Sequence, residues 1–154
     1  MIKENFIEFS FVDNNDYETE IIPDFDKFKT LNSAEQYYLA YNYNWDDGVI
    51  VLDWIIDSQK CDKGTASLIF WSAEPDFYFD YTSETIEEYE KPIWILLQKI
   101  LKRFKNNDFK YNRLKFDPQK SGYKTDWKIK YDIWELPTEL KTPTKGIVPI
   151  GLGI

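Results

Sequence analysis

The chain has 154 residues, of which 43% are apolar and 18% aromatic, which excludes an intrinsically disordered chain and is enough for one domain with a hydrophobic core. The net charge of −8, the absence of histidine and the single cysteine exclude histidine-dependent catalytic triads and an intramolecular disulfide. No apolar run reaches the roughly 18 residues of a transmembrane helix and no secretory leader begins the chain, so we expect a soluble, cytoplasmic protein.

Residues 1–32 are acidic and aromatic, and they predict an N-terminal extension that packs on the main domain. The imperfect alternation of apolar and polar residues from Phe6 to Val12 allows a short strand. Pro23 excludes the interior of a helix at its own position.

Residues 33–105 predict a helical core, because apolar residues recur there at the spacing of amphipathic helices. Helices are expected over residues 34–41, 49–56, 66–73 and 93–104, with a shorter helical turn that ends at Tyr89. Their common buried face is predicted to consist of Leu52, Ile55, Ile56, Ile69, Phe70, Leu96, Leu97 and Ile100. Cys61 has no histidine to activate it and is expected to be a small buried residue.

Polar residues immediately before these helices predict where the helices begin. Ser33, either Asp46 or Asp47, and Asp62 are the candidate N-caps of the first three helices. Pro92 suits the first turn of the long fourth helix, since proline lacks the backbone donor that a first turn leaves unused.

Residues 106–154 predict a basic, partly extended C-terminal segment. Apolar residues alternate with charged ones from Trp127 to Ile133, and this period of two predicts a strand between Lys124 and Trp134. The expected fold class is therefore mainly α. We expect one compact helical domain, residues 1–154, of about four to five helices, with a short strand or two in the terminal extensions.

The charge is distributed unevenly along the chain. Residues 1–98 hold 21 acids and 6 bases, a net of −15, whereas residues 99–154 hold 6 acids and 13 bases, a net of +7, and together these give −8. One interpretation is steering toward a partner with a basic face. The other is that the two halves pair with each other inside the fold. Nucleic acid is an unsuitable partner for so negative a chain.

Two groups of carboxylates invite a catalytic or metal-binding interpretation. The run from Asn42 to Gly48 has some of the spacing of a calcium-binding loop, but its glycine comes one place late and Asp53 stands where a bidentate glutamate belongs. A tight turn with an N-cap is the favoured interpretation. Asp53 and Asp57 share a helix face, and we expect them either to be solvated or to form a salt bridge with the basic half.

The densest acidic region lies between the third and fourth predicted helices. It is interpreted either as a solvated face or as a surface for a basic partner, with neighbouring aromatic rings as anchors. The candidate partner-binding residues are Asp76, Phe77, Tyr78, Asp80, Tyr81, Glu84, Glu87 and Glu88. No catalytic residue, metal ligand or cofactor site is predicted.

Two motifs resemble a known bacterial family. Asn44-Trp45-Asp46-Asp47-Gly48 is followed, after an apolar helix, by Cys61-Asp62-Lys63-Gly64-Thr65-Ala66 and a second apolar run, Leu68 to Trp71. This pattern resembles the domain of unknown function 4274 over about residues 33–80. The segment from Trp134 to Gly146 also looks like a closing segment of such proteins. The family has no established catalytic residues to carry over, and some of its members resemble immunity proteins encoded beside toxins.

The resemblance and the charge together favour a non-enzymatic immunity-type protein that binds and neutralises a cognate protein toxin with a basic surface. Inhibition would occur by occlusion. One alternative is a hydrolase that uses carboxylates, with or without a divalent metal held by Asp46, Asp47 and Asp53. Another is a structural or adaptor module. The oligomeric state is not indicated by the sequence.

Overall fold

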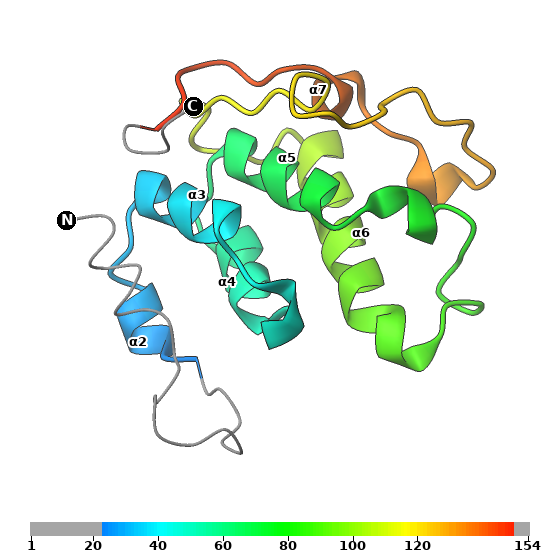
Figure 1. Cartoon of the computed structure of the whole chain (residues 1–154), viewed down its shortest axis with the longest axis horizontal. Coiled ribbons are helices and arrows are strands. Elements are labelled where there is room, and N and C mark those ends of the chain that lie inside the picture. Colours follow the sequence, from blue (N-terminus) through cyan, green and yellow to red (C-terminus); the bar gives the residue numbers. More distant parts are fainter. Residues whose placement is uncertain (1–22, 150–154) are drawn as a thin grey trace.

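The computed structural model describes residues 23–149, and within this range it is built almost entirely of helices and turns (Figure 1). The α-helices are α2 (Phe25–Phe28), α3 (Ser33–Tyr41), α4 (Ile50–Asp57), α5 (Lys63–Ser72), α6 (Lys91–Lys105) and α7 (Thr138–Lys141). The 3-10 turns are η1 (Trp45–Asp47), η2 (Pro75–Tyr78), η3 (Glu88–Glu90) and η4 (Asp132–Trp134). Extended pairing in this range is limited to two isolated bridges, Asp62 with Tyr111 and Leu114 with Ile147. The predicted mainly α class is therefore confirmed.

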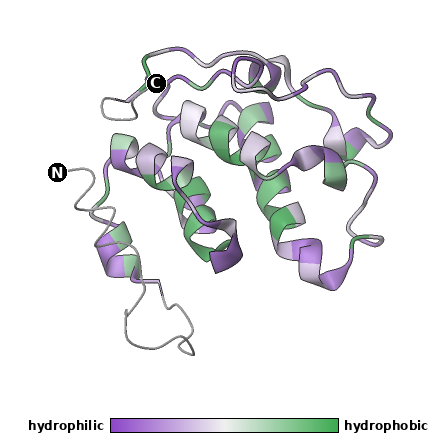
Figure 2. Cartoon of the chain, in the orientation of Figure 1, coloured by the Kyte–Doolittle hydropathy of each residue, from purple (hydrophilic) through white to green (hydrophobic). Residues whose placement is uncertain are grey.

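The buried centre of the fold is α5, which packs against α3 and α6, while α4 packs against α6. Every residue of α5 from Lys63 to Trp71 is buried, because the helix has other elements on all its sides. Figure 2 shows apolar residues concentrated on α4, α5 and α6. The eight predicted core residues are all at most 1% exposed, so the predicted buried face is confirmed. Cys61 is also fully buried, as expected.

The start of α3 lies one residue before the predicted position. Asn32, not Ser33, is the N-cap, and it forms a capping box in which its side chain accepts from the Glu35 backbone while the Glu35 carboxylate accepts from the Asn32 backbone. Ser33 has a different role, since its hydroxyl donates to the Lys60 carbonyl at 2.5 Å. That bond ties the start of α3 to the loop that precedes α5.

Residues 106–149, here called the C-terminal wrap, run over the helices along one side of the molecule (Figure 1). Buried tryptophan and tyrosine side chains attach this segment to the helices. The Trp71 indole on α5 donates to the Leu140 carbonyl at 2.8 Å, and the Tyr37 hydroxyl on α3 donates to the Lys115 carbonyl at 2.9 Å. Trp134 from the wrap is completely buried beside Phe79.

The prediction of a strand between Lys124 and Trp134 is wrong, because residues 123–129 have no regular secondary structure, residues 130 and 131 form a bend, and η4 follows. Trp127, Ile129 and Tyr131 are half-buried against the helical core, which explains their alternation without any sheet. A strand also needs a neighbour for its backbone groups, and no neighbouring strand exists among residues 23–149. The expected strand near Phe6 lies outside the described residues.

The described part of the N-terminal extension is anchored by α2. Asp24 caps this short helix, and Phe28 is buried beside Trp54 of α4, with ring centroids 5.6 Å apart. No helix in the described range is both long and apolar enough to cross a membrane.

Candidate functional site

Residues 74–90, here called the acidic segment, connect α5 to α6 and contain seven carboxylates and no basic residue. The chain turns sharply where the segment begins, because Glu74 has a left-handed backbone with φ of 54°. Pro75 then starts η2, and η3 leads directly into α6. Six of the seven carboxylates are exposed: Glu74, Asp76, Asp80, Glu84, Glu87 and Glu88.

Hydrogen bonds, two of them partly buried, connect the acidic segment to α6 and to the C-terminal wrap. The carbonyl of Tyr81 accepts from two indoles, that of Trp134 at 2.8 Å and that of Trp94 at 3.2 Å. The Thr85 hydroxyl accepts from the Thr82 backbone at 2.8 Å and closes the turn before η3. The segment is therefore fixed from α6 on one side and from the C-terminal wrap on the other.

Tyr78 does not have the exposure that a partner-binding role requires. It is only 4% exposed, and its hydroxyl donates to the Glu90 carboxylate at 2.5 Å. Burial and the carboxylates of Glu90 and Glu74 raise the pKa of Tyr78, so the phenol remains protonated and a donor. We therefore correct its predicted role: Tyr78 supports the segment from inside.

The other predicted aromatic residues are more accessible. Phe77 is 50% exposed and Tyr81 is half-buried, and their rings lie 5.6 Å apart. Tyr89, which is not among the predicted residues, is 77% exposed on η3. The remaining predicted residues, Asp76, Asp80, Glu84, Glu87 and Glu88, are all exposed, and among described residues only Glu88 forms an ion pair, to Lys91 at 3.6 Å.

The first family-like motif, Asn44 to Gly48, forms a surface turn. Asn44 caps η1 by accepting from the Asp46 backbone at 3.1 Å, and Gly48 ends the turn with φ of 81°. The predicted capping role of Asp46 or Asp47 is wrong, because both lie inside η1 and α4 begins after Val49 without a side-chain cap. Asn44 directly precedes η1 and therefore caps it, whereas Asp46 and Asp47 come too late in the sequence to do so.

The second motif contains a buried carboxylate that joins two parts of the fold. Asp62 is fully buried and caps α5 as predicted, accepting from the Gly64 backbone at 2.8 Å. It also accepts from the backbone of Arg113 at 2.7 Å and of Leu114 at 3.2 Å. The same carboxylate thus starts α5 and holds the C-terminal wrap against it. Helix periodicity could not indicate this contact, because Arg113 and Leu114 lie 51 and 52 residues further along the chain.

The paired carboxylates of α4 form salt bridges to the basic half, one of the two expected outcomes. Lys99 of α6 contacts Asp53 at 3.1 Å and Asp57 at 2.7 Å. These bonds raise the pKa of Lys99 against the opposing effect of burial. Over the described residues no group of three or more carboxylate, cysteine or histidine side chains could hold a metal ion, so Asp46, Asp47 and Asp53 do not converge.

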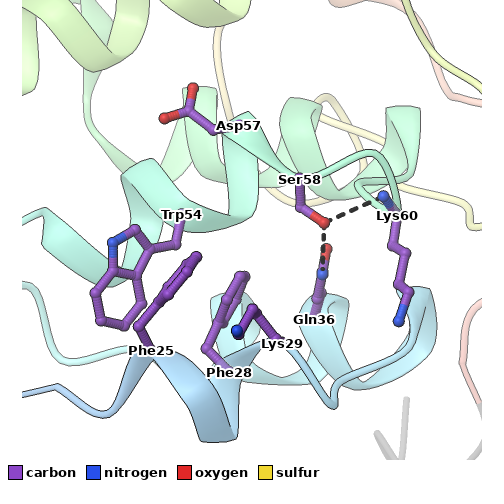
Figure 3. A pocket seen from close by; sticks show the side chains of 8 residues that line it. All are labelled: Phe25, Phe28, Lys29, Gln36, Trp54, Asp57, Ser58 and Lys60. Carbon is purple, nitrogen blue, oxygen red and sulfur yellow. Dashed lines mark hydrogen bonds between the residues drawn. The ribbon is translucent and has the colours of Figure 1, made fainter.

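A cavity of about 360 Å³ opens between α2, α3 and α4, and we call it the aromatic cavity (Figure 3). Phe25, Phe28 and Trp54 form its apolar wall, with the Phe25 and Trp54 centroids 4.9 Å apart. Gln36 and Ser58 face this wall. Only the three-residue spacing of Phe25 and Phe28 was visible in the sequence, and their approach to Trp54 depends on tertiary packing.

The fold and these surfaces define a small helical domain with a hydrogen-bonded acidic segment and a separate aromatic cavity. Residues 32–105 match the family model of a domain of unknown function, DUF4274. The matched residues contain both of the motifs that resemble this family, and they include α3 to α6 and the acidic segment. Neither the curated proteins nor the solved structures contain a match to the chain.

Proposed function

We propose that the protein is a non-enzymatic, immunity-type inhibitor that binds a basic protein toxin through the acidic segment and occludes it. The observation that carries the proposal is unpaired negative charge on a fixed surface. Five of the six exposed carboxylates in the segment form no ion pair among the described residues. A partner that supplies lysine or arginine would pair charges that the fold itself leaves unpaired.

The rigidity of the acidic segment supports this function, because a preorganised surface loses less conformational entropy on binding. The two indole bonds to Tyr81 and the Tyr78–Glu90 bond fix the backbone before a partner arrives. The carboxylates therefore project from a frame that is already ordered.

Exposed rings in the acidic segment supply contact area beside the charges. Phe77 and Tyr89 are half-exposed and largely exposed, and aromatic residues of this kind are frequent interface hot spots. We assign the carboxylates mainly to the rate of association and the rings mainly to the lifetime of the complex. Such an inhibitor would act in the cytoplasm, the compartment expected from the sequence.

The experiment that tests the proposal uses the protein encoded beside the gene as the candidate toxin. Co-expression of the full chain is expected to restore growth of cells that produce this toxin, and the two purified proteins are expected to form a complex in calorimetry. Substituting Phe77 and Tyr89 by alanine should weaken the complex about tenfold or more through faster dissociation. Toxicity unchanged by co-expression, with no complex in calorimetry, would refute the proposal.

A further inference from the structure

A polar pocket opens where the start of α5 meets the C-terminal wrap, and we call it the lysine pocket. Its volume is about 370 Å³, which lies in the range of small-molecule sites. Lys63 of α5 lines this pocket together with four polar residues of the wrap, Asn107, Asn112, Glu139 and Lys145. None of its lining residues belongs to the acidic segment, so the lysine pocket is separate from the surface proposed to bind the toxin.

Lys63 is the unusual residue of the lysine pocket, because lysine side chains are almost never so deeply buried. Its backbone N–H donates to the Tyr111 carbonyl at 3.0 Å, which fixes the point where the side chain begins. Its ammonium contacts the Glu139 carboxylate and lies 5.6 Å from the centroid of the Phe104 ring. The Lys63 side chain is 10% exposed and lines the pocket, so a ligand reaches the amine through the pocket.

Two features of the pocket disfavour the charged form of Lys63. Burial removes water from the ammonium, and the positive charge of Lys145 acts on it from the same pocket, so the pKa of Lys63 is lowered. The Glu139 carboxylate opposes this shift, but its side chain is 61% exposed and water therefore screens its charge. A buried lysine beside a second cation is the arrangement that turns an amine into a nucleophile.

We propose that Lys63 is a nucleophilic amine that forms an imine with a small 2-oxo acid bound in the lysine pocket. The Glu139 carboxylate takes one proton from the ammonium, and the neutral amine attacks the carbonyl carbon. The carbonyl oxygen then receives one proton from the amine and one from Glu139 and leaves as water. The product is a protonated imine, and Glu139 is ionised again. Lys145 attracts the ligand's carboxylate, and the amides of Asn107 and Asn112 supply hydrogen-bond donors at the wall.

Borohydride trapping of the full chain with pyruvate tests the proposal, because borohydride reduces an imine to a stable secondary amine. Peptide mass mapping then compares the modification of Lys63 with that of Lys128, an exposed lysine of the wrap outside the pocket. Lys63 should be modified at least about tenfold faster, since each unit by which a lysine pKa falls raises the neutral fraction about tenfold. Excess lactate has the carboxylate without the carbonyl, and it should protect Lys63 but leave Lys128 unchanged.

Two variants test the part played by the pocket. Lys145→Gln removes the second cation and should slow trapping at Lys63 about two- to fivefold. Lys120→Gln is the matched control, because Lys120 is an exposed lysine of the wrap outside the pocket, and it should leave the rate unchanged. Equal modification of Lys63 and Lys128 in the natural chain would overturn the proposal, and this comparison does not depend on the folding of any variant. Trapping at Lys63 that neither lactate nor Lys145→Gln changes would overturn the assignment of a 2-oxo acid to the pocket.

Discussion

Replacing Asp62 by alanine should destabilise the fold far more than the loss of an ordinary helix cap. The substitution leaves three backbone donors without an acceptor, those of Gly64, Arg113 and Leu114, and the Asp62 side chain that it removes is completely buried. An orphaned buried donor costs about 1–3 kcal/mol, so a loss of roughly 3–5 kcal/mol is expected after partial relaxation. A simple exposed cap costs about 0.5–2 kcal/mol.

Urea unfolding followed by circular dichroism measures this loss, with Asn32→Ala as the matched control. Asn32 caps α3 through one exposed bond to the Glu35 backbone at 2.9 Å, so its replacement should cost about 1 kcal/mol. The Asp62 variant should also release the C-terminal wrap, which limited proteolysis within residues 111–114 would detect. Equal losses in the two variants, with an unchanged cleavage pattern, would refute the joining role of Asp62.

Three further predictions concern the core. Gly64→Ala should lower the free energy of unfolding, although alanine has the better helix propensity, because the new Cβ would lie 2.0 Å from the Leu114 carbonyl oxygen. An increased urea midpoint would contradict this contact. Leu97→Ala should cost about 2–5 kcal/mol in the same assay, since Leu97 has no exposed surface, and a loss below about 1 kcal/mol would contradict its burial. Burial raises the pKa of the Cys61 thiol to about 12. A thiol reagent at pH 8 should therefore react slowly with the native chain and rapidly with the chain unfolded in urea. Equal reaction rates would show that the thiol is accessible in the native chain.

Helix periodicity allowed the core to be predicted because α4, α5 and α6 bury apolar residues at regular spacing. The face that contains Leu52, Ile69 and Leu97 follows directly from that spacing. Helix starts were less predictable, because several polar residues near a start can each act as a cap. Asn32 was selected over Ser33 by the capping box with Glu35, a pairing of two side chains that a single cap preference does not include.

Contacts between distant residues account for what the sequence did not reveal. The aromatic alternation around Trp127 has the same period in a strand and in an extended segment that packs on helices, so the pattern alone could not distinguish the two. Tyr78 and Phe77 are adjacent in sequence and their rings are in contact, with centroids 5.0 Å apart, yet Tyr78 is buried and Phe77 is half-exposed. The aromatic cavity likewise depends on the distance between Phe28 and Trp54 in space.

The most direct test of whether the acidic segment binds the toxin is the association rate of a variant in which this segment is neutralised. One variant carries amides at Asp76, Asp80, Glu84, Glu87 and Glu88. The control variant removes the same number of negative charges at exposed positions elsewhere, and these are Asp46, Asp47, Asp126, Asp132 and Glu135. Both are compared with the natural chain by stopped-flow mixing with the toxin over a salt series.

We expect the first variant to associate at least about tenfold more slowly at low salt and to lose most of the salt dependence, while the control remains much closer to the natural chain. Net charge alone would slow both variants equally, so the difference between them reports the local surface. Association rates that are flat with salt, or equal in the two variants, would contradict the assignment of the acidic segment as the binding surface.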